Sequence, residues 1–332
     1  MLEVRDTAFK HYFGFIAERM NIFWNRVEGK NKLTDDSILK EHKFTNVYRV
    51  LDRVSQYLIS EVIYNPTESS EEEDIFTRII VFKIFNKIET WEYIKINYGE
   101  VTYSNFDPER LSRILTELQI RTPIFSAAYM MTGSHSRYNH LKTKHHKWLY
   151  MVQEELINGR LFLDILKSKS LEEVYVLLRN CSFMGDFIAY QYATDLNYSN
   201  CIDYDENSFV MAGIGAVRGI KKCFKNLGGL STEGVIRHVY DNFEFYAEKY
   251  DCTSIKLLSG RDLKLIDLQN CFCETDKYLR AKMPELSVGN KRIKQRYKSV
   301  NKPISYRFPP KWGVNEIKSS SWNLSHQELT LF

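Results

Sequence analysis

The sequence predicts an all-α protein built from two helical lobes. Its 332 residues include only 15 glycines and 7 prolines, and 44% of them are apolar. Apolar side chains recur about one helical turn apart in long runs, as they do in amphipathic helices. The chain is long enough for one large domain or two lobes. We expect a helical domain over residues 1–282, with lobes of about 1–158 and 159–282, and a separate arm over 283–332.

The predicted helices have recognisable boundaries. Asp107 and Pro108 form an N-cap and a first-turn proline that begin a helix reaching about residue 119. Ser170 and Glu173 form a capping box at the start of another helix. The remaining helices are expected over 7–27, 44–64, 75–98, 183–199, 212–224, 232–249 and 261–280. No strand is expected.

The charge of the chain is concentrated near its C-terminus. The net charge is +4, but residues 283–332 hold nine Lys/Arg and three Asp/Glu, which gives 9 − 3 = +6. Aromatic side chains alternate with these basic residues, a pattern typical of nucleic-acid contacts. A disordered tail is the alternative.

The composition argues against several classes of protein. The six cysteines form no C-x-x-C pair, so we expect reduced thiols and no zinc or iron–sulfur site. The charged N-terminus does not resemble a signal peptide, and no run of about 18 apolar residues occurs. His135, His140 and His145 lie five apart in a basic segment, 134–147, which favours a loop facing solvent or phosphate. We therefore predict a cytoplasmic monomer without metal or cofactor.

The segment 261–280 carries the principal candidate site. Asp267, Asn270, Glu274 and Lys277 follow a 3-4-3 spacing, which places them on one face of a helix. Two acids, an amide and a lysine suit the polar floor of a cleft. A plain solvated helix face is the alternative.

The segment 44–64 supplies a second polar face with the same spacing. Asn46, Arg49, Arg53 and Gln56 lie on it, with Asp52 beside them. Two helices with this alternation suggest two walls of one site, in which Asn46, Arg49, Arg53 and Asn270 form a substrate pocket. Chance repetition of the spacing is the alternative.

A third feature is the glycine-rich segment AGIGAVRGIKK. Gly213 and Gly215 precede a helix, and such turns expose backbone N–H groups that bind anions. Arg218, Lys221 and Lys222 follow at once, which suits a DNA phosphate. The string is no P-loop, since no G-x-x-x-x-G-K-[ST] occurs in the chain.

Four blocks carry a family resemblance: KFTNVYRVLDRVSQYLI, FMGDFIAYQYATDL, GIGAVRGIKKCF and IDLQNCFCETDKYLR. In this order they resemble the alpha-glutamyl/putrescinyl thymine pyrophosphorylase family, which is similar to the helical domain fused to 5-hydroxymethyluracil DNA kinases. The resemblance implies a relation to helix-hairpin-helix DNA glycosylases. Ile214 stands where that family's G-P-G-A turn has proline.

The glycosylase relation implies a flipped base in a pocket and a catalytic carboxylate. Asp267 is favoured for that role over Asp195, and Asp205 is a third candidate. Glu274 and Lys277 would assist on the same face. Tyr190, in the second block, would line the base pocket.

Three functions follow from these features. The leading hypothesis is a DNA glycosylase that excises a bulky modified pyrimidine from phage DNA, in defence against phage. The alternative is a transferase that displaces pyrophosphate from an activated 5-methyl pyrimidine in DNA, using an amine or amino acid. A third hypothesis is a non-catalytic DNA-binding module.

Overall fold

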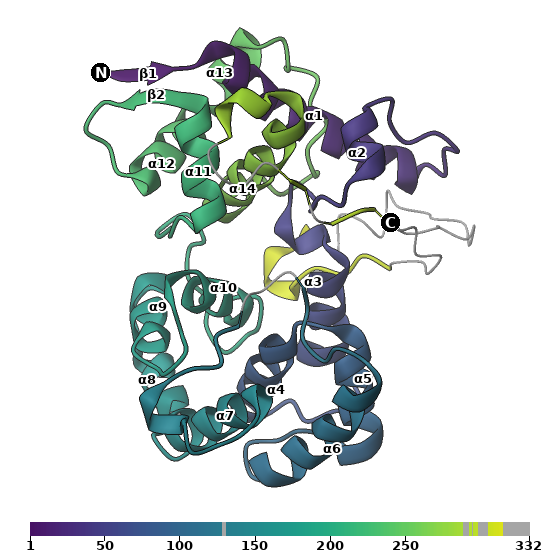
Figure 1. The fold of residues 1–332 in the computed structure, drawn as a ribbon, viewed down its shortest axis with the longest axis vertical. Coiled ribbons are helices and arrows are strands. Elements are labelled where there is room, and N and C mark those ends of the chain that lie inside the picture. The colour runs from purple at the N-terminus through teal and green to yellow at the C-terminus, as the bar shows by residue number, and fades with distance from the viewer. Residues whose placement is uncertain (128–130, 288–291, 294, 298–304, 315–332) are drawn as a thin grey trace. The chain divides into compact units, whose positions relative to one another are not determined.

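The computed structural model describes residues 1–127, 131–287, 292–293, 295–297 and 305–314. These residues are mostly helical, as predicted, and the chain forms two compact units (Figure 1). The first unit joins residues 1–53 to 209–332, and the second comprises 54–208. This division differs from the predicted lobes, because the first helix packs against the last long one. Among the described residues, no helix combines the length and apolar composition needed to cross a membrane.

The first unit is organised around helices α1 and α14, whose aromatic side chains interdigitate. The Tyr12 and Phe272 rings stack with centroids 4.1 Å apart, and Phe9 packs edge-on against Tyr246 at 5.0 Å. The elements of this unit are β1 (Leu2–Val4), α1 (Asp6–Val27), α2 (Ser37–Glu41), η1 (Arg49–Leu51), α11 (Ile214–Cys223), β2 (Phe224–Leu227), α12 (Thr232–Asp241), α13 (Phe243–Lys249), α14 (Leu265–Lys282), η5 (Pro284–Leu286) and η6 (Pro310–Trp312).

The first unit also contains a small two-stranded sheet, which the all-α prediction did not include. Strands β1 and β2 pair antiparallel, with Leu2 opposite Leu227 (Figure 1). The Arg5 backbone N–H donates to the carbonyl of Cys223 at 2.7 Å, just beyond the ladder. The pairing joins residues 2–4 to residues 224–227, which lie far apart in the sequence, and short strands of this kind leave little local pattern.

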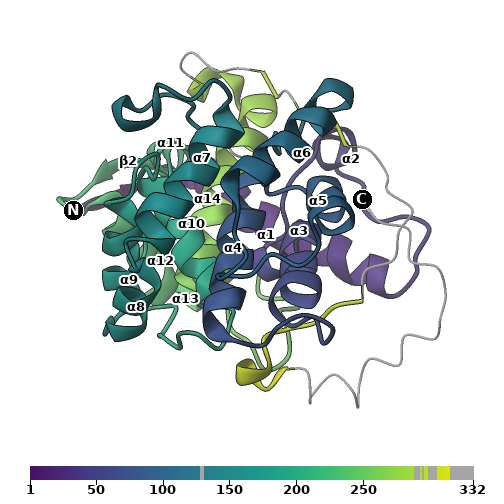
Figure 2. The same cartoon turned by 90° about the horizontal axis from the view of Figure 1, so that it is seen from below.

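The second unit is organised around helix α4, in which Ile75–Phe85 are all buried. Figure 2 shows α4 between α10 and α5. The elements of this unit are η2 (Leu58–Ile63), α4 (Glu72–Phe85), α5 (Ile88–Tyr98), α6 (Pro108–Arg121), η3 (Ser136–Tyr138), α7 (Lys144–Met151), η4 (Val152–Ile157), α8 (Leu161–Lys167), α9 (Leu171–Arg179) and α10 (Asp186–Leu196). The chain enters this unit through α3 (Arg53–Tyr57).

Two predicted helix starts in this unit are confirmed by their caps. The Asp107 carboxylate accepts the Arg110 backbone N–H at 3.0 Å, with Pro108 at the first helical position. The Ser170 hydroxyl accepts the Glu173 N–H at 3.1 Å. Each side chain satisfies a backbone donor that the helix itself leaves unpaired.

Two other predictions for local structure are wrong. The expected helix over 44–64 begins only at Arg49 and consists of a 3₁₀ turn, a short α-helix and a π-helical turn. The expected loop 134–147 ends where α7 begins, at Lys144. His145 is fully buried there and its ring lies 3.0 Å from the Thr116 hydroxyl. Burial lowers the pKa of His145 to about 4.

The basic arm, 283–332, is described only in part, and residues 315–332 lie outside the described range. Residues 295–297 run beside 41–43, where the Lys43 N–H donates to the Gln295 carbonyl at 3.1 Å. Phe308 and Val314 are fully buried. The described part of the arm therefore packs within the first unit.

Candidate functional site

The polar face of α14 begins at Asp267, which caps the helix. One carboxylate oxygen accepts the Lys264 N–H at 2.9 Å, and the other accepts the Arg49 N–H at 2.9 Å. Asp267 is only 3% exposed. These contacts attach η1 to the start of α14. The side chain predicted to be the catalytic carboxylate therefore has a structural role here.

Further along the same face, Glu274 and Lys277 form a close pair. Lys277 Nζ lies 2.6 Å from Glu274 Oε2, which also accepts the Thr45 N–H at 3.0 Å. The ammonium lies 4.5 Å from the centre of the Phe44 ring. Glu274 is buried and Lys277 half-buried. The structure thus places segment 44–46 against the predicted stripe.

Asp52 and Arg19 complete this group. Asp52 Oδ1 accepts the backbone N–H of Asn46 at 2.8 Å, and the Asn46 side-chain oxygen accepts from Arg19 Nη2 at 2.9 Å. Burial raises the pKa of Asp52 to about 6, although the Asn46 N–H acts in the opposite direction. We call Arg19, Asn46, Asp52, Glu274 and Lys277 the α14 polar cluster.

A carboxyl group with a pKa of about 6 can take up a proton near neutral pH, which suits general base catalysis. The cluster also holds two cations and a second carboxylate. Sequence reasoning found Asn46, Glu274 and Lys277 but missed Arg19. Arg19 lies on the long amphipathic helix α1, and nothing in its local sequence distinguishes it from a solvated arginine.

The other predicted pocket residues occupy nearby positions. Arg49 is 4% exposed and lies in η1, held by its backbone to Asp267. Arg53 is half-buried at the first residue of α3, and Asn270 is half-buried between the turns that carry Asp267 and Glu274.

The glycines of the AGIGAVRGIKK segment allow α11 to lie directly on α14. A Cβ at Gly215 would come within 2.2 Å of Cys273 Sγ, and one at Gly219 within 2.0 Å of the Phe272 carbonyl oxygen. Gly213 is the N-cap of α11. The structure therefore assigns Gly215 a packing function, whereas the sequence suggested a phosphate turn.

Asp276 lies on the face of α14 that meets α11, and it organises the basic residues there. Lys222 Nζ lies 2.9 Å from Asp276 Oδ1, and it also donates to Ser287 Oγ at 3.0 Å. Arg218 lies 3.3 Å from the same carboxylate, and Arg280 donates to it from one turn away. Burial alone raises the pKa of Asp276, but hydrogen bonds from Lys222 and Arg280 outweigh it and leave the pKa below its usual value.

This arrangement corrects the expectation for Lys222, whose ammonium is buried and committed to Asp276. Lys221 is exposed and the Arg218 side chain is 45% exposed, so both can still meet a phosphate. The sequence did contain one signal for Asp276: Arg280 follows it at the i, i+4 spacing of a helical ion pair.

Asp195 and Tyr190 belong to the second unit, on α10. Asp195 is fully buried and its Oδ2 lies 2.9 Å from Lys83 Nζ on α4. The same ammonium donates to Asn86 Oδ1 at 2.7 Å. Tyr190 is 1% exposed. Asp195 and Lys83 therefore form a buried charged pair in the core of this unit, and Tyr190 is buried in the same core.

The fold and these clusters define a mostly helical protein whose first unit carries a partly buried acid–base cluster and exposed basic side chains. The family model for the helical domain of 5-hmdU DNA kinases matches residues 6–288, so the chain belongs to that family. A 5-hmdU DNA kinase of Bacillus phage SP10 is 24% identical over 324 residues, which are 92% of this chain and 51% of that protein. The chain thus spans about half the length of this relative. No solved structure matches.

These comparisons correct the leading functional hypothesis. The phage relative is named a 5-hmdU DNA kinase. A kinase is a transferase, so this name describes group transfer to a modified base in DNA. The prediction of a hydrolytic DNA glycosylase is therefore wrong. The resemblance to the helical domain of these kinases is confirmed, and the transferase alternative agrees better with it.

Proposed function

We propose that this chain is a transferase that acts at the 5-methylene carbon of a pyrophosphorylated 5-hydroxymethyluracil in DNA. The observation that carries the proposal is the match of residues 6–288 to the helical domain of 5-hmdU DNA kinases. In the reaction we propose, an amine or amino acid replaces pyrophosphate on an activated 5-methylene group. DNA with modified bases, such as phage DNA in the cytoplasm, is the proposed substrate.

The α14 polar cluster supplies groups suited to that reaction. The amine nitrogen bonds to the 5-methylene carbon while the carbon–oxygen bond breaks and pyrophosphate leaves with the electron pair. The proton released by the amine passes to a carboxylate, for which we propose Asp52 or Glu274. The pKa of Asp52, raised to about 6, suits a proton acceptor near neutral pH.

The exposed cations of α11 support binding of the DNA backbone. We propose that Arg218 and Lys221 contact phosphates, and that Lys277 balances negative charge near the leaving group. Asp267 is proposed to hold η1 and α14 together at this site through its two backbone contacts. A helix-hairpin-helix ancestry remains a prediction about the core.

Phosphoryl transfer from ATP to the hydroxymethyl group is the second candidate, and it is favoured by the name of the phage relative. P-loop kinases hold ATP through G-x-x-x-x-G-K-[ST], and this string does not occur in the 332 residues of the sequence. For that reason we place pyrophosphate displacement first.

The two reactions differ in their products. DNA carrying 5-(pyrophosphoryloxymethyl)uracil is incubated with glutamate or putrescine, and DNA carrying 5-hydroxymethyluracil with ATP. The DNA is then digested to nucleosides for mass spectrometry. A nucleoside that gains the amine while pyrophosphate is released supports displacement, and a phosphorylated nucleoside supports the kinase. DNA left unchanged in both reactions would contradict transferase activity.

A matched pair of variants tests the cluster itself. Asp52→Asn removes the proposed proton acceptor but keeps the side-chain oxygen that accepts from Asn46, so transfer should fall about 100-fold. Asp262→Asn alters an exposed carboxylate near the start of α14 and should leave the rate unchanged. Equal rates in the two variants would remove Asp52 from the mechanism.

A further inference from the structure

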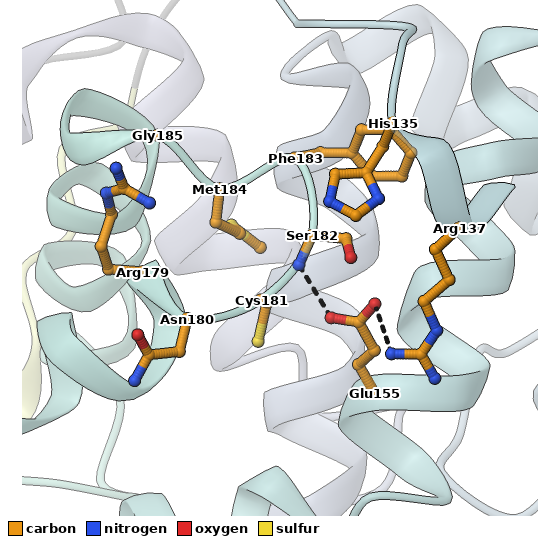
Figure 3. Close-up of a pocket in the computed structure, with 10 residues that line it drawn as sticks. All are labelled: His135, Arg137, Glu155, Arg179, Asn180, Cys181, Ser182, Phe183, Met184 and Gly185. Atoms are coloured by element: carbon orange, nitrogen blue, oxygen red, sulfur yellow. Dashed lines mark hydrogen bonds and ion pairs between the residues drawn. The ribbon is translucent and has the colours of Figure 1, made fainter. Parts of the chain in front are cut away.

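The second unit contains a pocket of about 550 Å³ that the proposed function does not use. It lies where segment 135–137, helix η4 and the connection between α9 and α10 come together (Figure 3). Its lining consists of His135, Arg137, Glu155 and the consecutive residues 179–185. Hydrogen-bond donors are frequent in this lining, which includes two guanidinium groups, an imidazole, an amide and a hydroxyl.

One carboxylate in the lining holds an arginine in position. Glu155 Oε1 lies 3.1 Å from Arg137 Nη1 and accepts the Tyr138 hydroxyl at 2.7 Å. Glu155 Oε2 accepts the Ser182 N–H at 2.8 Å, as Figure 3 shows. The Glu155 side chain is only 11% exposed, whereas that of Arg137 is 55% exposed. Glu155 therefore already has donors on both oxygens, and the guanidinium it orients can face a ligand.

Arg179 provides a second cation at the opposite side of the lining (Figure 3). It pairs with Asp186 at 2.5 Å, and both side chains are about half exposed. An ion pair so exposed to water contributes little free energy, so a phosphate can compete with Asp186 for the guanidinium. The lining therefore holds two arginines and one carboxylate, and Asp186 beside it supplies a second carboxylate to Arg179.

His135 has a buried ring nitrogen that lacks a partner. Its Nδ1 is shielded from solvent, and it makes no hydrogen bond to any described residue. Its ring packs edge-on against Phe183, with centroids 5.3 Å apart. Buried polar atoms nearly always have partners, and the same His135 ring lines the pocket.

The backbone of the connection between α9 and α10 is strained at the pocket. Phe183 has a φ of +67°, a conformation that bulky residues rarely adopt. Its ring is held by Trp148 at 5.2 Å and Tyr138 at 5.5 Å. Strain of this kind persists where surrounding packing imposes it, and it is common at ligand sites.

We propose that this pocket binds a phosphate group, held by Arg137, Arg179 and His135. Guanidinium forks match phosphate oxygens in geometry, and charge-assisted bonds of this kind are strong. From sequence alone, the basic segment that begins at residue 134 was expected to face solvent or phosphate. The source of the phosphate is either a free anion or the DNA backbone. The proposal does not depend on the transferase reaction.

Direct titration tests the pocket. Inorganic phosphate and pyrophosphate are titrated into the full chain by calorimetry, and a short oligonucleotide without terminal phosphates is titrated separately. The double variant Arg137→Gln, Arg179→Gln should weaken whichever ligand binds by at least about tenfold. Arg113→Gln, an exposed arginine on α6, is the matched control and should bind like the original chain.

The pattern of loss identifies the source. Weaker binding of free anions indicates a pyrophosphate or phosphate ligand, and a loss confined to the oligonucleotide indicates the DNA backbone. Unchanged affinity for all three ligands in the double variant would overturn the proposal. If the double variant does not fold, as judged by its thermal melt, Arg179→Gln alone serves, because Arg179 pairs with Asp186 where both side chains are about half exposed. His135→Ala should also weaken binding, by an independent contact.

Discussion

The contact between α11 and α14 is most directly tested by substituting Gly219. An added Cβ would lie 2.0 Å from the carbonyl oxygen of Phe272, and real Cβ atoms essentially never approach closer than 3.0 Å. The helices must therefore separate by about 1 Å, since a backbone carbonyl inside α14 cannot rotate away as a side chain can. That movement would disturb the Tyr12–Phe272 stack on the other side of α14.

The size of the effect follows from two opposing contributions. Alanine is favoured over glycine inside a helix by about 1 kcal/mol. Overpacking of a close contact costs about 1–3 kcal/mol and occasionally more. A clash with backbone belongs at the high end, so we expect Gly219→Ala to lower the free energy of unfolding by about 2 kcal/mol.

Gly234 provides a matched control. It lies inside α12, and a Cβ there would meet its nearest atom, Leu230 Cβ, at an ordinary 3.4 Å. Gly234→Ala should therefore raise stability by up to about 1 kcal/mol. Urea unfolding followed by circular dichroism measures both changes. If Gly219→Ala is as stable as Gly234→Ala, the close approach of α11 to α14 is wrong.

Three further predictions concern charged groups. Asp276→Asn leaves the buried Lys222 ammonium without its carboxylate and should lower the free energy of unfolding in urea by about 3–5 kcal/mol. Adding Lys222→Met should recover most of that loss. If the costs of the two substitutions simply add, the two side chains do not form a pair. Burial lowers the pKa of His145 from 6.5 to about 4, so its contribution to stability is complete above pH 6.5 and is lost as the pH falls through 4; His145→Gln should flatten this part of a stability–pH profile. Burial raises the pKa of Asp52 from 3.8 to about 6, so its contribution is present below pH 3.8 and is lost as the pH rises through 6; Asp52→Asn should therefore be the more stable protein at pH 7, and a less stable variant would refute the shift.

Local sequence predicted those features that depend on neighbouring residues. The caps at Asp107 and Ser170 were found because a capping side chain and the backbone donor it satisfies lie within three residues of each other. The stripe of Glu274 and Lys277 was found because helical periodicity places residues three apart on one face. The family resemblance extended the prediction of a helical fold to most of the chain.

The functional conclusion needed more than local pattern. The resemblance led to the glycosylase hypothesis because it implied a relation to helix-hairpin-helix DNA glycosylases. The name of the phage relative indicates group transfer instead. Glycines before a helix suggested an anion-binding turn. The absence of a glycine side chain also allows two helices to pack closely, which the sequence does not distinguish from anion binding. Only the position of Phe272 distinguishes these two uses at Gly219.

By itself, the sequence determined a mostly helical chain, the start of several helices, a polar stripe on α14 and a resemblance to the helical domain of 5-hmdU DNA kinases. The tertiary structure alone decided that Arg19 and Asp52 form hydrogen bonds with Asn46 and that Lys222 forms a buried ion pair with Asp276. It also decided that residues 1–53 share a unit with the C-terminal part of the chain. The reason is physical: a helix is encoded by contacts within one or two turns, whereas burial and the pKa of a carboxylate depend on segments hundreds of residues away, which leave no periodic trace in the sequence.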